Sequence, residues 1–229
     1  MSNNFFHDNR KTVPRPHDLL WITDLAGLAT DQPLPSWATA EWLASAPVVI
    51  RREKMTDVAW LPVGLRGRTR SERFKALLSG DAVGKCVPPE FLVRTEAWND
   101  GAQFSAFPAV KALVSMASTL TATELSWGPT GSVGFALASG LPVLREESDL
   151  DVVVRASVPL RIEYIELLKA VQSSSLCRID IQIDTGNGGF AFAEWIGGRK
   201  TVLLKTDIGP VLTADPWAVT NIIDAVGSS

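Results

Sequence analysis

The chain has 229 residues, 46% of them hydrophobic and 21% charged, which is enough for one large or two small globular domains with a sizeable core. Its formal net charge is −3, so the chain lacks the strong overall basic charge that is typical of nucleic-acid-binding proteins. It also lacks a run of about 18 apolar residues that could cross a membrane. Two cysteines and two histidines offer neither a zinc cluster nor a disulfide framework, and the N-terminal residues show no secretion signal, which predicts a cytoplasmic protein.

The N-terminal part of the chain, residues 1–95, predicts a small α/β domain. Ser36 is a favourable helix N-cap before apolar residues at helical spacing, and Gly80 ends a second predicted helix. Two runs between these helices are rich in β-branched and aromatic residues and predict a pair of strands. The predicted elements are a helix at residues 36–45, strands at 48–51 and 58–63, a helix at 71–78 and a loop at Pro88–Pro89.

The rest of the chain, residues 96–229, predicts a larger domain in which strands and helices alternate. The predicted elements are a helix at 108–120, a strand at 124–127, a helix from Ser132, a strand at 149–155, a helix at 160–172, a strand at 177–184 with a hairpin partner at 189–195, a strand at 201–204 and a helix at 216–226 capped by Asp215. This order predicts the α/β (α+β) fold class with two unequal domains.

Asp149 and Asp151 are the most informative residues of the sequence. They open an apolar run that predicts a strand, so the two carboxylates share one face, with their Cα atoms about 6.5–7 Å apart. Such a pair suits a hard cation, and Mg²⁺ in particular completes its shell with substrate phosphates and water. Because an Asp-x-Asp pair also occurs at ordinary solvated strand ends, the prediction of a magnesium site depends on the neighbouring motifs.

A glycine-rich turn, Gly128-Pro-Thr-Gly131, leads into the helix that begins near Ser132. Backbone N–H groups and the positive end of the helix dipole at such a turn bind phosphate, so Gly131 and Ser132 are predicted substrate-binding residues. The turn is not a P-loop, since no Gly-Lys-Ser/Thr follows at the required spacing. The alternative is an ordinary strand-to-helix turn.

A third carboxylate is available on the strand at 177–184, where Asp180 and Asp184 both lie on the polar face. They are about 13 Å apart along the strand, so only one of them can join the Asp149–Asp151 pair. Asp180 lies between two isoleucines, whereas Asp184 precedes a glycine-rich turn in which an acid commonly bonds its own backbone. We therefore predict Asp149, Asp151 and Asp180 as the catalytic and metal-binding residues, with Asp180 also serving as general base.

Residues 51–75 carry eight basic and three acidic side chains, a net charge of +5 in a chain that is acidic overall. Arginine matches phosphate geometry with two parallel hydrogen bonds. The predicted substrate-binding subset is the group of arginines around Gly67, namely Arg66, Arg68, Arg70 and Arg73. The alternative is a solvated charged face.

Several short motifs together resemble a known family. They are residues 127–135 (Trp-Gly-Pro-Thr-Gly-Ser-Val-Gly-Phe), 147–152 (Glu-Ser-Asp-Leu-Asp-Val), 179–183 (Ile-Asp-Ile-Gln-Ile) and Glu194-Trp195, with the earlier segments 15–21 and 62–67. This set is similar to the malonate decarboxylase holo-acyl-carrier-protein synthases, also called phosphoribosyl-dephospho-CoA transferases. More broadly, the set resembles the superfamily of DNA polymerase β, although the gap from Ser132 to Asp149 is longer than is usual there.

The resemblance implies a polymerase-β-like nucleotidyltransferase domain in the C-terminal part and a definite reaction. The family transfers phosphoribosyl-dephospho-CoA from its triphosphate precursor to a serine of the acyl carrier protein subunit of malonate decarboxylase, and pyrophosphate leaves. The expected partners are therefore this precursor and this carrier, with no nucleic acid and no membrane. The basic segment would bind either the precursor or the carrier, because acyl carrier proteins are usually acidic.

Other functions remain open at this point. A different polymerase-β-like nucleotidyltransferase would modify a small molecule or another protein with the same carboxylates. A degenerate member would act only as a nucleotide-binding module, against which the three intact aspartates argue. A metal-dependent glycosyltransferase also uses Asp-x-Asp but normally has a longer chain.

Overall fold

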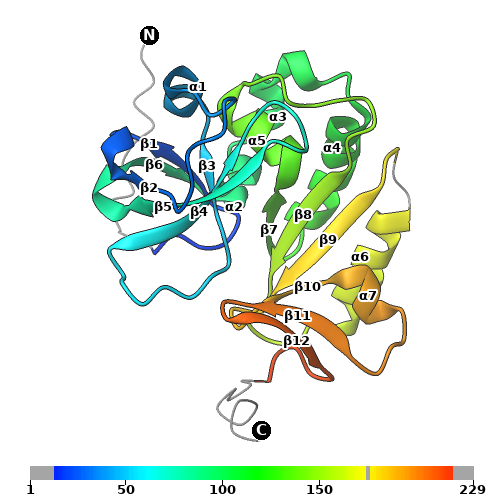
Figure 1. The fold of residues 1–229 in the computed structure, drawn as a ribbon. Helices are drawn as coiled ribbons and strands as arrows, with labels where there is room; N and C mark the ends of the chain where they lie inside the picture. Colours follow the sequence, from blue (N-terminus) through cyan, green and yellow to red (C-terminus); the bar gives the residue numbers. More distant parts are fainter. Residues whose placement is uncertain (1–12, 174–175, 219–229) are drawn as a thin grey trace, which may run out of the picture.

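The computed structural model describes residues 13–173 and 176–218. The structure is built around two six-stranded sheets (Figure 1). The sheet of the N-terminal part has the strand order β2-β5-β4-β3-β1-β6, and the sheet of the C-terminal part has the order β12-β11-β10-β9-β8-β7. The structure therefore has the α+β class and the two-part layout that the sequence predicts.

The first sheet is antiparallel throughout. Its strands are β1 (Leu19–Ile22), β2 (Leu28–Ala29), β3 (Val48–Ile50), β4 (Trp60–Arg66), β5 (Arg73–Ser79) and β6 (Val83–Val87). Its helical segments are α1 (Ala40–Ser45) and the 3₁₀ turns η1 (Leu25–Gly27) and η2 (Gly80–Ala82). The predicted strand pair at 48–51 and 58–63 is confirmed as β3 and β4.

The predicted helix at 71–78 is wrong, because this segment is strand β5. It pairs with β4 over seven residues, and its residues alternate between more and less exposed positions, with Ala76 and Leu78 buried. Two boundaries also differ. Helix α1 begins at Ala40, where the Thr39 hydroxyl accepts from the Trp42 N–H at 3.2 Å, and the predicted loop at Pro88–Pro89 opens a helix instead. Proline suits the first turn of a helix, where an N–H is not needed.

The second sheet is antiparallel except between the neighbouring strands β8 and β9, which are parallel. Its strands are β7 (Ser126–Pro129), β8 (Leu150–Arg155), β9 (Ile179–Asp184), β10 (Gly189–Ala191), β11 (Val202–Thr206) and β12 (Gly209–Thr213). The helices are α2 (Pro89–Arg94), α3 (Ala97–Asp100), η3 (Ala102–Phe104), α4 (Pro108–Thr121), α5 (Gly131–Ser139), α6 (Ile162–Ser173) and α7 (Phe192–Ile196).

Most elements predicted for this part are confirmed, with one partial exception. The segment at 189–195 forms the predicted hairpin partner only as far as Ala191 and then turns into α7. The helix predicted at 216–226 lies outside the described residues from 219 onward. None of the helices in the described residues combines the length and apolar character needed to span a bilayer.

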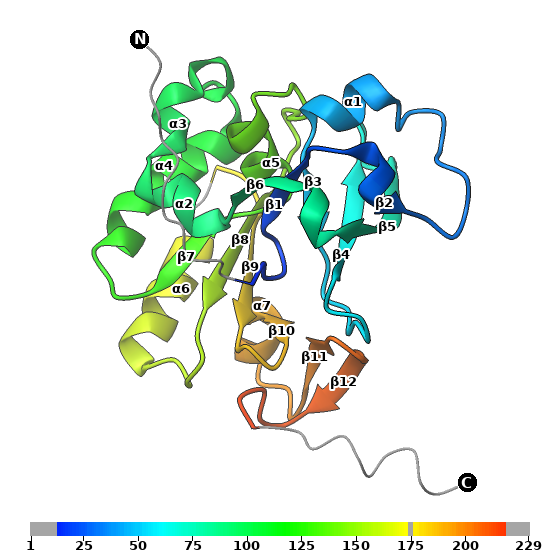
Figure 2. The same cartoon turned by 90° about the vertical axis from the view of Figure 1, so that its left-hand side faces the viewer.

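The two faces of strand β9 have different environments. Ile179 lines a small cavity together with Met116 of α4 and Val171 of α6, and Figure 2 shows these helices on one side of the second sheet. The first sheet lies on the other side (Figure 2). Alternation along the strand therefore turns Asp180 and Gln182 towards the first sheet, where both side chains are half-buried.

Candidate active site between the two sheets

A cleft of about 830 Å³ is lined by residues of both sheets. Strands β4 and β5 supply one wall, and strands β8 and β9 with the start of α5 supply the other. Ligand sites in proteins commonly have volumes of roughly 300–1,000 Å³, and the volume of this cleft falls within that range. Most of the residues selected from the sequence lie around this cleft.

The acidic wall carries Asp151 and Asp180 side by side. The two residues are register partners in the parallel β8–β9 pair, where neighbouring strands lie about 4.8 Å apart. Both line the cleft. Asp149 directly precedes β8, and its Oδ2 is 3.4 Å from Nη2 of Arg70, which comes from the opposite wall.

These carboxylates repel one another. Burial, together with Asp180 and Asp149, raises the pKa of Asp151, whereas Arg66 and Arg70 oppose this shift. A concentration of carboxylate oxygens is the donor set that a hard cation such as Mg²⁺ prefers. In the described ranges 13–173 and 176–218, no three His, Cys, Asp or Glu side chains form a group that could hold a metal ion as they stand. Metal binding by Asp149, Asp151 and Asp180 therefore stays a prediction.

The turn between β7 and α5 is pressed against the acidic wall. Gly131 has φ +56, and a Cβ added there would lie 1.9 Å from Oδ2 of Asp151, so only glycine fits this position. The Thr130 N–H donates to the Asp151 carbonyl at 2.8 Å. Helix α5 starts at Gly131, and Thr130, Gly131 and Gly134 line the cleft.

Ser132 lies one residue further along and is half-buried, but it is not among the residues that line the cleft. The backbone N–H groups of the first turn of α5, rather than the Ser132 hydroxyl, are the groups of this turn best placed for an anion.

The basic wall contains three of the four predicted arginines. Arg66, Arg70 and Arg73 line the cleft, whereas the exposed Arg68 lies over the Trp42 ring with its guanidinium carbon 4.5 Å from the centroid. The Arg66 guanidinium lies 5.3 Å from the centroid of the Phe135 ring, a neighbour that fixes its place beside the acids.

Arg66 differs from the other two arginines in its burial. Burial and the neighbouring Arg73 lower the pKa of Arg66 to about 10, and Asp151 opposes this shift. Among the described residues its buried Nε has no hydrogen-bond partner. At neutral pH Arg66 is therefore a fixed positive charge with an N–H available to an anion.

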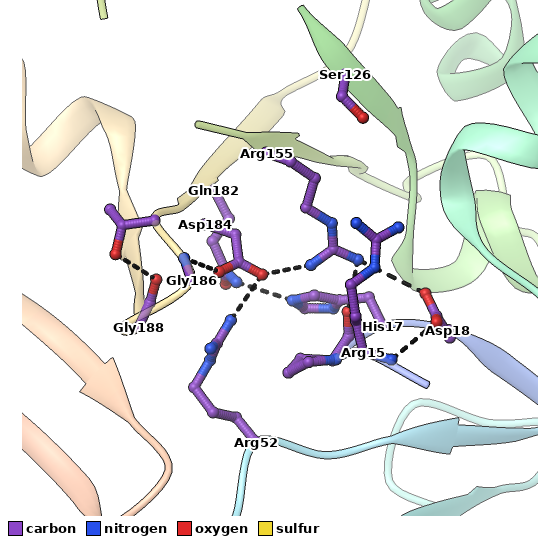
Figure 3. Close-up of polar contacts among 12 residues, drawn as sticks. Arg15, His17, Asp18, Arg52, Ser126, Arg155, Gln182, Asp184, Gly186 and Gly188 are labelled. Carbon is purple, nitrogen blue, oxygen red and sulfur yellow. Dashed lines mark hydrogen bonds and ion pairs between the residues drawn. The ribbon is translucent and has the colours of Figure 1, made fainter. Parts of the chain in front are cut away.

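A second charged cluster, which the sequence does not reveal, joins the two sheets. Figure 3 shows Arg155, at the end of β8, between Asp184 of β9 and Asp18 of the N-terminal part. Arg155 also contacts Glu90 at 3.2 Å, and Arg52 contacts Asp184 at 2.9 Å. The Arg155, Asp184 and Asp18 side chains are at most 10% exposed, so these ion pairs lie in the interior.

Asp184 thus has a structural position, away from Asp151. Burial alone would raise the pKa of Asp184, but Arg52, the Gly186 N–H and Arg155 lower it on balance. The Gly186 N–H donates to Oδ1 at 3.0 Å, the local backbone bond expected of an acid before a glycine-rich turn.

Comparison with known proteins gives one consistent result. Residues 15–89 match the family described as "Phosphoribosyl-dephospho-CoA transferase MdcG N-terminal domain", and residues 97–216 match the corresponding "MdcG C-terminal domain". No solved structure matches the chain.

Relatives that carry the name phosphoribosyl-dephospho-CoA transferase are similar over nearly their whole length. The protein of Pseudomonas putida (strain GB-1) is 42% identical over 207 residues, which is 90% of this chain and 96% of that protein. The protein of Klebsiella pneumoniae (strain 342) is 40% identical over 90% of this chain and 97% of its own. The chain belongs to the phosphoribosyl-dephospho-CoA transferase family.

Proposed function

We propose that the protein transfers phosphoribosyl-dephospho-CoA from its triphosphate precursor to a serine of the acyl carrier protein subunit of malonate decarboxylase, in the cytoplasm, and releases pyrophosphate. The observation that carries this proposal is the cleft, in which Asp151 and Asp180 face Arg66, Arg70 and Arg73. A paired carboxylate wall opposite an arginine wall suits the transfer of a phosphoryl centre that carries a polyphosphate leaving group. The name of the relatives supports the same substrate.

The basic wall and the turn before α5 would hold the triphosphate. Arg70 and Arg73 offer forked N–H donors to the cleft. The start of α5 adds free backbone N–H groups and the positive end of the helix dipole to the same cleft. Arg66 would neutralise charge that accumulates on the departing pyrophosphate, because it stays charged and cannot move away from Phe135 without losing its packing.

The carboxylates Asp149, Asp151 and Asp180 would hold the magnesium that the sequence predicts. Their oxygen donors and the raised pKa of Asp151 fit a divalent cation, which when bound supplies positive charge to the phosphate oxygens. In the transfer, the serine Oγ of the carrier forms a bond to the phosphorus next to the ribose. The bond from this phosphorus to pyrophosphate breaks, and Asp180 accepts the serine proton.

A transfer assay tests the proposal directly. The protein is mixed with magnesium, the triphosphate precursor and the carrier subunit, and the intact mass of the carrier is measured together with pyrophosphate release. We expect the carrier to gain the mass of one phosphoribosyl-dephospho-CoA group. Pyrophosphate release without any modified carrier would favour another acceptor, and neither product would exclude the proposed reaction.

The basic wall gives a prediction with an internal control. Arg70→Gln and Arg73→Gln should each raise the Km for the precursor about tenfold, since a lost charge-assisted hydrogen bond of about 1.4 kcal/mol is a factor of ten. Arg68→Gln removes the same charge from the same segment but outside the cleft, so its Km should stay near wild type. If only the Km for the carrier rises, this wall binds the carrier instead.

A further inference from the structure

Gln182 and His17 also line the cleft, and the proposed reaction assigns no role to either of them. Gln182 follows Asp180 on the same face of β9, about 7 Å away along the strand. It meets His17, which comes from the segment before β1, and both residues line the cleft. Figure 3 shows the two side chains pointing towards one another.

His17 is held in a backbone conformation that residues with a Cβ rarely adopt. Its φ is +78, in the left-handed region. The His17 N–H donates to the Ile50 carbonyl at 3.1 Å, and the next N–H, from Asp18, donates to the Arg15 carbonyl at 3.0 Å. Conformations of this kind persist where the surrounding structure enforces them, and they are concentrated at ligand sites.

The His17–Gln182 pair is uncharged at neutral pH. Burial, together with Arg155 and Arg52, lowers the pKa of His17 to about 4. The Gln182 amide nitrogen lies 2.8 Å from Nε2 of His17, so the amide donates, Nε2 accepts and the imidazole proton resides on Nδ1. A Cβ added at Gly189 would lie 2.6 Å from this amide nitrogen, so β10 packs closely against the amide and limits its movement.

The remaining groups of the pair match an uncharged, hydrogen-bonding ligand. Among the described residues only His17 contacts the Gln182 side-chain amide through a hydrogen bond, so the amide retains a second N–H and its carbonyl oxygen. An adjacent donor and acceptor on one amide is the arrangement that reads the edge of adenine. The nearby cations Arg52 and Arg155 are already paired with Asp184, and Leu19 and Val49 add apolar surface to the cleft.

We propose that His17 and Gln182 bind the adenosine portion of the dephospho-CoA group, an assignment that rests on the proposed function. The reacting phosphate would lie at Asp151 and Asp180, and the ribose of the phosphoribosyl group and the ribose of the adenosine would lie between this phosphate and the base at Gln182. Two parts of one cleft thereby recognise two chemically different parts of the substrate.

Calorimetric titration with two probes tests the adenosine part and the phosphate part of the site separately. Dephospho-CoA reports on the part of the site at His17 and Gln182, and inorganic tripolyphosphate reports on the part that would bind the triphosphate. The variants are Gln182→Ala and His17→Gly, in which glycine removes the histidine side chain and adopts φ +78 without strain. Gln103→Ala is the matched control, since Gln103 is an exposed glutamine away from the cleft.

We expect His17→Gly and Gln182→Ala to weaken dephospho-CoA binding about tenfold or more, the effect of one or two hydrogen bonds, and tripolyphosphate binding by less than about twofold. In the transfer assay the Km for the precursor should rise while kcat changes little. Equal weakening of both probes with a lower thermal midpoint would make His17 a purely structural residue and overturn the assignment, as would unchanged dephospho-CoA binding.

The outcomes for the two proposals are distinct. If wild-type protein binds dephospho-CoA through this pair but modifies no carrier, the proposed reaction fails and the subsite stands. If both variants transfer with wild-type Km and kcat, the reaction stands and the subsite is wrong.

Discussion

Asp151→Asn is expected to reduce transfer by several orders of magnitude. The substitution keeps the shape of the side chain and removes the anionic oxygen that lies at the centre of the acidic wall, next to Asp180 and against Gly131. In the proposed reaction, both the binding of a divalent cation and the positioning of the phosphate beside the turn would depend on this charge. Neither neighbour can replace it, because Asp149 lies before the strand and Asp180 is assigned to the serine proton.

The same variant should fold at least as stably as wild type at neutral pH. A carboxyl whose pKa is raised in the folded protein holds its proton more tightly when folded, so its ionisation at pH 7 opposes folding. Asparagine is uncharged, so the substitution removes the repulsion between residue 151 and the carboxylates of Asp180 and Asp149. Stability gained and activity lost in one variant would separate a catalytic role from a structural one.

The measurement is kcat and the thermal midpoint at pH 7 for Asp151→Asn beside Asp81→Asn, an exposed carboxylate outside the cleft. The control should match wild type in both quantities. Turnover within about tenfold of wild type for Asp151→Asn would end the proposed mechanism, since a single ordinary hydrogen bond accounts for that much.

The sequence predicts the acidic wall well because two local patterns determine it. An apolar run after Asp149-x-Asp151 predicts β8, and three alternating isoleucines predict β9 with Asp180 on its polar face. The prediction that Asp180 lies near Asp151 also assumes that their two strands are neighbours. In the structure β8 and β9 are paired in parallel. The polymerase-β likeness stays a prediction from these motifs.

Strand β5 shows where local reasoning fails. Residues 71–78 contain good helix formers, but Phe74, Ala76 and Leu78 recur with period two, which is the signal of a half-buried strand. Pairing with β4 outweighs the weak helix propensity of this segment. The correction matters for the site, because it places Arg73 on a strand directly beside Arg66, as its register partner, instead of on a helix.

The contacts between the two halves could not be predicted from one sequence. Arg155 follows three valines and Asp18 precedes two leucines, so each looks like a charged residue at the end of a strand. Their pairing joins positions 137 residues apart, and no periodicity or motif encodes such a distance. His17 is similar, since its partner Gln182 lies 165 residues away.

Asp180→Asn and Asp184→Asn, two identical substitutions on one strand, should have opposite effects. Asp180→Asn should lower kcat by about 10²–10⁴, the contribution of a general base, and leave the thermal midpoint nearly unchanged. Its partner Arg178 has 72% of its side chain exposed, and ion pairs that are open to solvent contribute little to stability.

Asp184→Asn should retain most of the activity and lose stability. Removing one partner of a buried ion pair costs about 3–5 kcal/mol, and here it leaves Arg52 and Arg155 without their shared carboxylate. For a chain of this size we expect the thermal midpoint to fall by roughly 6–20 °C.

The pH dependence gives an independent check on Asp184. Its pKa is lowered in the folded protein, so its contribution to stability is fully present above its unfolded pKa of about 4 and is lost as the pH falls through the folded value. The stability difference between wild type and Asp184→Asn should therefore be largest at neutral pH and should shrink in acid. A constant difference down to low pH would show that packing, rather than the carboxylate charge, is responsible. If Asp184→Asn loses activity while Asp180→Asn stays active, the third carboxylate of the site is Asp184.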